Sequence, residues 1–509
     1  MSQLPPHDSS ESEPQDPLGL FEEIVEAETG RDPDLAVIEA GSRTLRTQGV
    51  GGPEADVPGR PADPETDKAL REVEAELATR WGETKLEPSV SRIAALVDVL
   101  GEPQRAYPSI HITGTNGKTS TARMIEALLG AFDLRTGRYT SPHVQSVTER
   151  ISLNGVSISA ERFIETYNDI KPYIEMVDAQ QEYRLSFFEV LTGMAYAAFA
   201  DAPVDVAVVE VGMGGSWDAT NVIDGAVAVI TPIDLDHTDR LGGTPGEIAV
   251  EKAGIVKQGA TVILAQQPVD AAQVLLKKAV EVDATVAREG LEFGVVARHV
   301  AVGGQLVTLR GLGGEYEEIF LPLHGAYQAH NAAVALAAVE AFFGVGAGQT
   351  QRLDIDNVRK AFASVTSPGR MEVVRRSPTV VLDAAHNPAG ARATAEAVSE
   401  AFDFSRLIGV VGASAEKDVR GVLEAFEPIL AEVVVTQNSS HRAMDADELA
   451  GVAVEVFGDD RVQVEPRLDD ALEAAITLAE QEGEYAGSGV LVTGSVITVG
   501  EARLLLGRG

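Results

Sequence analysis

Short apolar runs alternate with helical patterns along most of this sequence, and this alternation constrains the fold more than any other feature. The runs at residues 107–113, 204–212 and 226–233 are short enough to be buried strands. A helical pattern at 119–131 follows the first run, and a second alternating series begins at residue 379. Strands that alternate with helices form parallel sheets covered by helices. The sequence therefore predicts an α/β protein.

The chain divides into an arm and two domains. Its 509 residues are enough for two or three domains with cores of their own. Residues 1–65 are rich in acidic residues, proline and serine, and they cannot bury enough apolar surface to offset the entropy of ordering, so we expect a disordered acidic arm. The first domain is predicted at 66–366, with 261–322 as a small antiparallel edge of its sheet. The turn SPGR at 367–370 breaks the pattern, and the second domain is predicted at 367–509.

Composition excludes several classes of function. The net charge of −37 repels nucleic-acid phosphates and anionic membranes. The absence of cysteine excludes disulfides, thiolate metal sites and a cysteine nucleophile. No apolar run approaches the roughly 18 residues of a membrane span, and the N-terminus lacks the pattern of a signal peptide. We therefore expect a soluble, cytoplasmic protein with no nucleic-acid or membrane partner.

A glycine-rich turn joins the first apolar run to a helical pattern, in HITGTNGKTSTARMIEALL. Backbone N–H groups at the start of such a helix can hold phosphate, Lys118 can neutralise it, and the Thr119 hydroxyl can hold Mg²⁺. The spacing departs from GxxxxGK[ST], which would need glycine at Ile112, whereas the nearest glycine is Gly114. An ordinary glycine turn is the alternative, but Gly-Lys-Thr at a helix start favours phosphate binding.

Polar side chains follow the next two apolar runs. Glu210 ends one predicted strand, where an acidic residue suits a Mg²⁺ ligand or a group that orders water. Asp236 and His237 follow the next strand at the same sheet edge, and the histidine is either a metal ligand or structural. The GMGG that follows Glu210 lacks the spacing of a dinucleotide-binding loop, so we reject nicotinamide binding. Lys252 lies within an apolar helical run, and an ordinary lysine there would face solvent.

The second domain offers another polar loop, in TVVLDAAHNPAG. Asp383 and His386 come after a strand and before a helix that opens at Pro388, so an acid and an imidazole lie near the ligand edge of the sheet. The alternative is an Asp–His pair that only caps the helix. Arg370, just past the break between domains, can place a guanidinium on a phosphate held by the first domain.

Together these motifs resemble the Mur-ligase-like ATP-dependent amide ligases, and within them the folylpolyglutamate synthase and dihydrofolate synthase family. The resemblance covers about residues 66–509. GTNGKTS is shared by the whole superfamily, whereas the folate branch is matched by SPHVQSVTERI, SFFEVLTGMAY, EVGMGGSWDATN, DHTDRLGGTPGEIAVEKAGI, SPGRME and DAAHNP. The resemblance implies a P-loop-type ATPase domain with a parallel sheet, followed by a Rossmann-like α/β domain for glutamate ligation.

The resemblance also implies roles for individual residues. The implied ATP-binding residues are Gly114, Thr115, Asn116, Gly117, Lys118, Thr119, Ser120, Asn331, Arg370 and Asp383. The implied ligands of Mg²⁺, at two sites, are Thr119, Ser141, Glu210 and His237. The implied catalytic residues are Lys118, Lys252, Asp383 and His386, with Lys252 carbamylated. The implied folate or pteroate contacts are Arg92, Ser186, Trp217 and Asp218. A monovalent cation is a further implied cofactor.

The implied reaction is the ATP-dependent addition of L-glutamate to folates, and also to dihydropteroate, through an acyl phosphate. Closure of the domains, with 367–370 as hinge, would keep water from this intermediate. Two alternatives stay open: a Mur-type peptidoglycan ligase and a non-catalytic ATP-binding regulator. Peptidoglycan ligases usually carry a nucleotide-sugar domain before the phosphate loop, and Glu65–Pro108 is too short for one. We expect a monomer that binds only small-molecule substrates.

Overall fold

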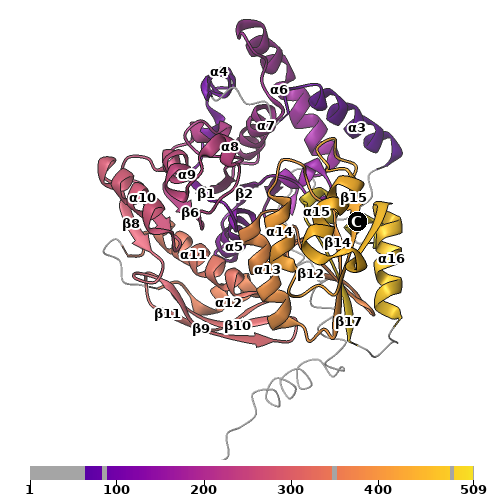
Figure 1. Cartoon of the computed structure of the whole chain (residues 1–509). Coiled ribbons are helices and arrows are strands. Elements are labelled where there is room, and N and C mark those ends of the chain that lie inside the picture. The colour runs from indigo at the N-terminus through magenta and orange to yellow at the C-terminus, as the bar shows by residue number, and fades with distance from the viewer. Residues whose placement is uncertain (1–62, 83–88, 347–351, 482–486, 508–509) are drawn as a thin grey trace, which may run out of the picture. The chain divides into compact units, whose positions relative to one another are not determined.

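The structure is a computed structural model that describes residues 63–82, 89–346, 352–481 and 487–507. These residues fall within one compact unit, Asp56–Gly509 (Figure 1). The predicted acidic arm lies outside the described residues except for its last three positions, which open the first described helix. No described helix has the length and apolar character needed to cross a membrane.

The elements alternate as the sequence predicts. The α-helices among the described residues are α3 Pro64–Ala78, α4 Ser91–Val99, α5 Lys118–Ala131, α6 Ala160–Gln180, α7 Phe187–Asp201, α8 Thr238–Leu241, α9 Pro245–Lys252, α10 Val269–Glu281, α11 Ala326–Phe342, α12 Ile355–Ala363, α13 Pro388–Ala401, α14 Val419–Phe426, α15 Ala446–Phe457, α16 Leu468–Glu480 and α17 Val496–Leu505. The strands are β1 Ser109–Thr113, β2 Thr136–Tyr139, β3 Ile151–Leu153, β4 Val156–Ser157, β5 Val206–Glu210, β6 Val227–Ile230, β7 Thr261–Leu264, β8 Thr285–Arg288, β9 Gly294–Ala301, β10 Gly304–Arg310, β11 Glu315–Leu321, β12 Glu372–Arg376, β13 Thr379–Leu382, β14 Arg406–Val411, β15 Glu432–Gln437, β16 Val462–Arg467 and β17 Ser488–Thr493.

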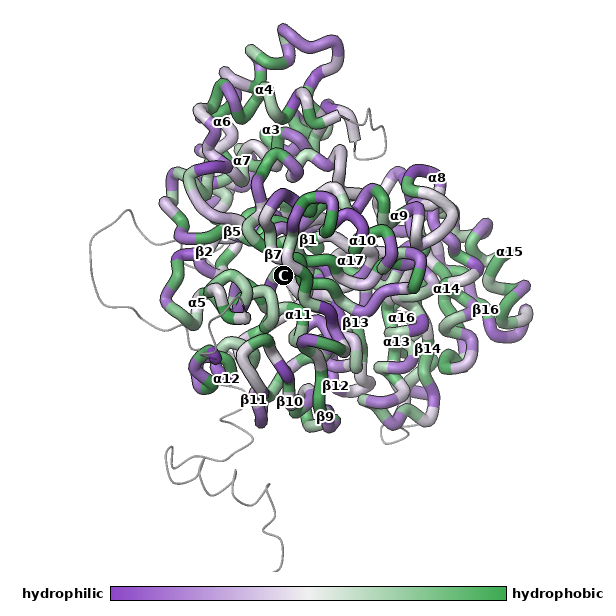
Figure 2. Tube along the Cα trace, turned by 90° about the vertical axis from the view of Figure 1, so that its left-hand side faces the viewer, coloured by the Kyte–Doolittle hydropathy of each residue, from purple (hydrophilic) through white to green (hydrophobic). Residues whose placement is uncertain are grey.

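The first sheet has the order β4-β3-β2-β5-β1-β6-β7-β8. Strands β2, β5, β1, β6, β7 and β8 run parallel to one another, whereas β3 is antiparallel to β2. Side chains alternate between its faces, as a strand requires. Val206 and Val208 of β5 pack into the core that holds α5 and α11, whereas Ala207 and Val209 pack into the core of α6 and α7. Both faces are therefore buried, which explains the nearly continuous apolar runs in the sequence. Helices such as α3 and α6 alternate between purple and green along the tube in Figure 2, as expected of helices with one apolar side.

The second sheet has the order β12-β13-β17-β14-β15-β16, with only β12 antiparallel to its neighbour. Val433 and Val435 of β15 face the core of α13, α14 and α15, and Val434 faces the core of α16. The predicted α/β fold, with a parallel-sheet ATPase part followed by a Rossmann-like part, is confirmed. The predicted domain boundary between residues 366 and 367 falls between α12 and β12, and it stays a prediction.

The prediction that residues 261–322 form one small antiparallel edge of the main sheet is wrong. Strands β7 and β8 are parallel members of the main sheet, and only β9, β10 and β11 are antiparallel, in a separate sheet of order β11-β10-β9. Helix α10 was not predicted, although its buried residues Ala271, Leu275 and Ala279 recur every four positions. This helix is the crossover that lets β7 and β8 lie parallel.

Candidate active site

The turn after β1 forms a tight loop whose two glycines have no room for a side chain. Gly114 has φ of 149°, and a Cβ there would lie 1.9 Å from Thr231 Oγ1. Gly117 has φ of 88°, and its Cβ would lie 2.6 Å from Asn331 Oδ1. Helix α5 begins directly after Gly117, so its free backbone N–H groups face the loop. This is the geometry expected of a phosphate-binding loop, although its spacing departs from the usual motif.

Two buried lysines meet at this loop. Lys118 Nζ donates to the carbonyls of Gly114 and Thr115, each at 3.1 Å, and Lys252 Nζ donates to the Gly114 carbonyl at 2.8 Å. Burial lowers the pKa of Lys118 and, together with the charge of Lys118, lowers the pKa of Lys252 to about 7. Lys252 is therefore buried rather than on a solvated helix face, and the loop concentrates positive charge where an anion can compensate it.

A buried carboxylate lies beside the loop. Glu210 is 1% exposed, and both of its oxygens accept a hydrogen bond from Thr119 Oγ1 at 3.0 Å. The backbone N–H of Ser141 donates to Glu210 Oε2 at 3.4 Å, and burial raises the pKa of Glu210. Hydroxyl and carboxylate oxygens are the ligands that Mg²⁺ prefers, and at nucleotide sites phosphate oxygens and water complete its shell. The donor set therefore fits Mg²⁺.

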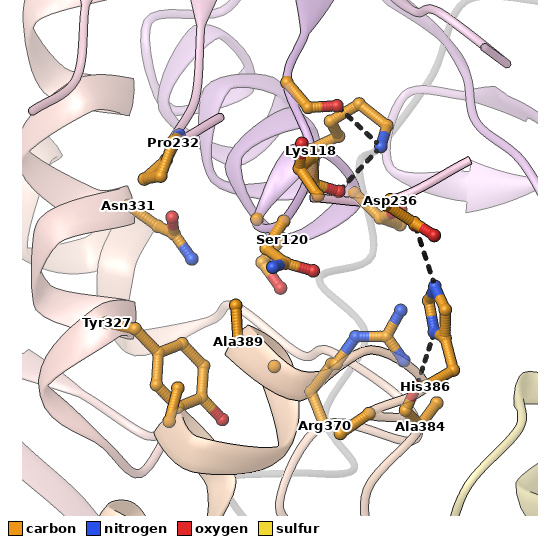
Figure 3. Close-up of a pocket in the computed structure, with 18 of the residues that line it drawn as sticks. Lys118, Ser120, Pro232, Asp236, Tyr327, Asn331, Arg370, Ala384, His386 and Ala389 are labelled. Atoms are coloured by element: carbon orange, nitrogen blue, oxygen red, sulfur yellow. Dashed lines mark hydrogen bonds and ion pairs between the residues drawn. The ribbon is translucent and has the colours of Figure 1, made fainter. Parts of the chain in front are cut away.

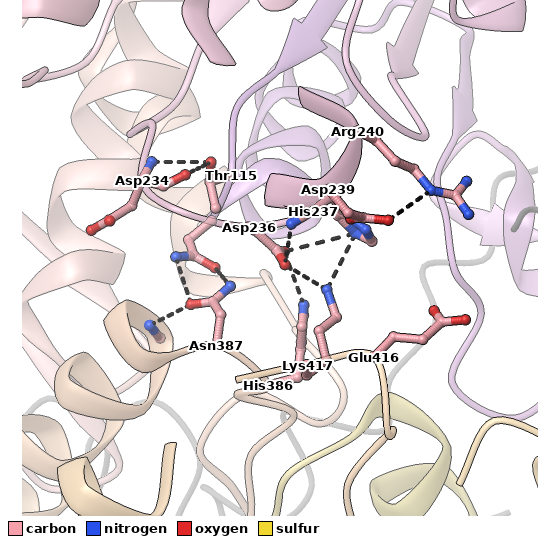
Figure 4. Close-up of polar contacts among 12 residues, drawn as sticks. Thr115, Asp234, Asp236, His237, Asp239, Arg240, His386, Asn387, Glu416 and Lys417 are labelled. Carbon is pink, nitrogen blue, oxygen red and sulfur yellow. Dashed lines mark hydrogen bonds and ion pairs between the residues drawn. The ribbon is translucent and has the colours of Figure 1, made fainter. Parts of the chain in front are cut away.

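Asp236 is the centre of a charged cluster at the cleft (Figure 4). Its Oδ1 accepts from Lys417 Nζ at 2.6 Å, and its Oδ2 lies 3.7 Å from His386 Nε2. Although burial acts in the opposite direction, His386 and Lys417 hold the pKa of Asp236 below its usual range. His237 Nε2 lies 3.2 Å from Lys417 Nζ, and burial lowers the pKa of His237 to about 4, so its ring is neutral at pH 7.

The loop after β13 does not form the Asp–His cap that was the alternative to a functional pair. Asp383 accepts from the backbone N–H groups of Met371 and Ala385 and from Thr394 Oγ1, at 2.8–3.0 Å. The cap of α13 is instead Asn387, whose side chain accepts from the Gly390 N–H. Burial raises the pKa of Asp383.

His386 lies on the cleft side of the same loop. Its Nδ1 contacts the Ala384 carbonyl at 2.9 Å, and its Nε2 faces Asp236 (Figure 3). The histidine therefore joins the charged cluster rather than the helix cap. It brings a titratable ring from the second sheet to the edge of the first.

Uncharged contacts also join the two sheets. The side-chain amides of Asn116 and Asn387 each donate to the other, at 3.0 and 3.3 Å. Ser120 of α5 lies 3.1 Å from Ser367 Oγ, so the predicted hinge segment touches the start of the phosphate-loop helix.

A cavity of about 490 Å³ brings together most of the predicted residues. It is lined by every residue predicted to bind ATP or metal and by every predicted catalytic residue: Gly114, Thr115, Asn116, Gly117, Lys118, Thr119, Ser120, Ser141, Glu210, His237, Lys252, Asn331, Arg370, Asp383 and His386. Because these side chains come from both sheets, the cavity lies where the carboxyl ends of β1, β5, β6 and β13 meet. This is the edge at which open α/β sheets bind ligands.

A second cavity of about 230 Å³ contains the four residues predicted to contact folate. Arg92 and Trp217 line it, with Arg92 Nε 3.1 Å from Glu189 Oε1. Ser186 and Asp218 also line it, but their oxygens are engaged in holding backbone: Ser186 accepts from the Glu189 N–H and Asp218 caps a short helical turn. The two cavities share the residues Ser141, Pro142, Gly212, Met213, His237, His386 and Val496.

Sequence reasoning gave no role to Lys417 and Arg442, which line the second cavity. Lys417 follows β14, so the rule that ligands bind beyond the carboxyl ends of strands was a signal that could have identified it. Arg442 follows β15 in the same way. The importance of Asp236 was also missed, because its partners lie in the second sheet.

Comparison with known proteins identifies the family of this chain. Residues 112–339 match the Mur ligase middle domain, and residues 369–496 match the Mur ligase glutamate ligase domain. A dihydrofolate synthase/folylpolyglutamate synthase of Mycobacterium tuberculosis is 52% identical over 466 residues, which cover 87% of this chain and 95% of that protein.

Solved structures agree. The Mycobacterium tuberculosis folylpolyglutamate synthase complexed with ADP superposes with a TM-score of 0.83 at 52% identity, covering 87% of this chain and 99% of that one. Escherichia coli FolC in complex with DHPP and ADP has a TM-score of 0.74 at 28% identity, covering 86% and 97%. The resemblance inferred from the motifs is confirmed: the chain belongs to the folylpolyglutamate synthase/dihydrofolate synthase family of Mur ligases.

Proposed function

We propose that this chain is an ATP-dependent ligase that adds L-glutamate to folates, and also to dihydropteroate, through an acyl-phosphate intermediate. The observation that carries the proposal is the junction of the two cavities at Ser141, His237 and His386. One cavity has a phosphate loop, and the other, which opens onto it, would take the acceptor. The names of the relatives, and the ADP and DHPP in their structures, support this assignment.

The first cavity would hold ATP. The backbone from Gly114 to Ser120 and the Lys118 ammonium would bind its phosphates, with Arg370 reaching them from the second sheet. Asn331 of α11 would contact the adenine. Asp383, whose oxygens already accept three hydrogen bonds, would position the 383–387 loop rather than move a proton.

Two Mg²⁺ ions fit the oxygen and nitrogen donors around the loop. Thr119, Ser141 and Glu210 would hold one ion, and neutral His237 would serve the other. When bound, Mg²⁺ would neutralise charge on the phosphates. Lys252 is proposed to be carbamylated, because a buried amine with a pKa of about 7 is about half neutral at pH 7 and mostly neutral at pH 8, and the neutral amine can react with CO₂. The monovalent cation stays a prediction.

The reaction would take place where the cavities meet. The acceptor carboxylate attacks the γ-phosphorus, the bond to the β–γ bridging oxygen breaks, and ADP leaves, which needs charge stabilisation and alignment more than covalent help from the protein. The glutamate amine, having lost a proton, then attacks the acyl carbon, and phosphate leaves. Lys417 and Arg442 would attract the glutamate carboxylates, and His386 Nε2 would face the amine.

The two alternatives are less well supported. The relatives reported above are named as folate ligases, and neither a peptidoglycan ligase nor a regulator is among them. The described residues before β1 form α3, α4 and a short 3₁₀ turn, which pack beside α6 and α7. The cytoplasmic location and the monomeric state stay predictions.

Product analysis would test the proposal. The full chain is incubated with ATP, Mg²⁺ and L-glutamate, and with dihydropteroate, tetrahydrofolate, a UDP-linked muramoyl peptide or no acceptor. We expect phosphate release and a product one glutamate heavier, by mass spectrometry, only with the two pterin acceptors. A glutamylated product from tetrahydrofolate alone would restrict the enzyme to polyglutamylation. Turnover with the muramoyl peptide, or ATP hydrolysis independent of any acceptor, would contradict the proposal.

A further inference from the structure

A histidine and a glutamate at the wall of the first cavity have no part in the chemistry described above. His330 lies in the second turn of α11, and Glu289 follows β8. Both line the cavity, together with Gln266. The Glu289 side chain is only 2% exposed, whereas that of His330 is 44% exposed. A buried carboxylate thus supports a ring that is accessible from the cavity.

The carboxylate of Glu289 orients this ring. Its Oε1 lies 2.5 Å from His330 Nδ1, and its Oε2 accepts from the backbone N–H of Gln266 at 3.0 Å. Both oxygens are engaged, so Glu289 is fixed in place. His330 Nε2 lies on the other side of the ring and has no hydrogen-bond partner within the described parts of the chain. The hydrogen bond with Glu289 raises the pKa of His330, which favours the protonated ring, in which Nε2 carries a hydrogen.

The neighbours of His330 indicate which part of a nucleotide it would meet. Asn331, the next residue, lies against Gly117 of the phosphate loop. Tyr327, one turn earlier, lies on the same wall, and Figure 3 shows both residues at the edge of the cavity opposite Lys118. Glu289 and Gln266 follow β8 and β7, which lie beyond β6 from β1, the strand that leads into the phosphate loop. His330 is thus beyond Asn331 as seen from the phosphates, at the nucleoside end of the site.

We propose that His330, oriented by Glu289, donates a hydrogen bond from Nε2 to the adenine base and so contributes to the selection of ATP over GTP. The inference rests on the proposed function as an ATP-dependent ligase. Adenine N1 accepts a hydrogen bond, whereas guanine N1 carries a hydrogen and donates. A fixed donor aimed at the position of N1 therefore favours adenine and opposes guanine, because the N1 hydrogen of guanine would leave it without a partner.

Nucleotide selectivity tests the assignment. Steady-state kcat and KM are measured for ATP, dATP and GTP with the wild-type chain, His330→Ala, and His299→Ala, which removes an exposed histidine of β9 away from both cavities. We expect His330→Ala to raise KM for ATP and for dATP about tenfold, the value of one charge-assisted hydrogen bond, with kcat within about twofold. The kcat/KM for GTP stays unchanged or rises, and His299→Ala behaves as the wild type.

Three results would overturn the inference: an unchanged KM for ATP, an equal loss for ATP and GTP, or a loss for ATP that dATP escapes, which would place His330 on the ribose. Glu289→Gln tests the positioning role: it should lower the ATP-to-GTP preference in the same direction, at an unfolding temperature close to that of the wild type. Turnover of the wild-type chain with a pterin acceptor tests the proposed function separately, because this turnover does not depend on the ratio of ATP to GTP preference.

Discussion

Replacing Gly114 by alanine should damage the site without touching a catalytic side chain. The new Cβ would lie 1.9 Å from Thr231 Oγ1 and 2.9 Å from the Thr231 carbonyl oxygen. Relief of the closer contact needs a movement of about 1 Å, and φ of 149° is itself unfavourable for alanine. Strain and overpacking together should cost about 2–5 kcal/mol of the free energy of unfolding. A 1 Å shift of the phosphate loop should lower kcat/KM for ATP about a hundredfold.

Gly130→Ala is the matched control for this prediction. Gly130 lies near the end of the same helix, α5, and a Cβ there would meet nothing within 4 Å. Alanine favours a helix over glycine, so this variant should be as stable as the wild type or up to about 1 kcal/mol more stable, with full activity. Urea unfolding and phosphate release measure both variants. A Gly114→Ala protein whose stability lies within about 0.5 kcal/mol of the wild type, with normal turnover, would refute the reasoning.

Three further predictions concern charged groups. Lys118→Ala should abolish phosphate release while thermal unfolding stays unchanged or shifts upward, because burial of the ammonium disfavours the folded state; near-normal turnover would contradict the assignment. Asp236→Asn should raise KM for glutamate at least about tenfold, because Lys417 loses the carboxylate that holds its ammonium in place, and an unchanged or lowered KM would show that the ion pair does not position the substrate site. Burial lowers the pKa of Lys252 to about 7, so its amine is mostly neutral above that pH and mostly charged below it. Activity and carbamate content, followed by mass spectrometry, should fall from pH 8 to pH 6 and rise with added bicarbonate at pH 8, whereas Lys252→Arg should not respond to bicarbonate.

Much of the fold could be predicted because its signals are local. The fully buried strand β5 appears as a continuous apolar run, and helix α9 begins at a recognisable cap, where Thr244 accepts from the Glu247 N–H. The pairing of β7 with β8 could not be read in the same way. Both are four-residue strands with partly exposed ends, and their parallel pairing depends on the packing of α10 rather than on their own residues.

The residues of the site likewise divide into those that could be predicted from local sequence and those that could not. The phosphate loop and Glu210 could be predicted because each lies next to a recognisable strand. The pairing of Lys417 with Asp236 could not, because the two residues lie 181 positions apart in the chain. Glu289 and His330 are separated by 41 residues and belong to no motif, so only the fold reveals their hydrogen bond.

The two kinds of contact that join the sheets at the cleft should respond differently to the ionic strength of the solution. The Asn116–Asn387 amide pair carries no net charge, so the salt concentration has little effect on its strength. The bond between Asp236 and Lys417 is a Coulombic attraction between side chains that are only 12% and 16% exposed, so mobile ions weaken it in part. High ionic strength should therefore weaken the contact at Asp236 to a limited extent, while the asparagine pair keeps its strength.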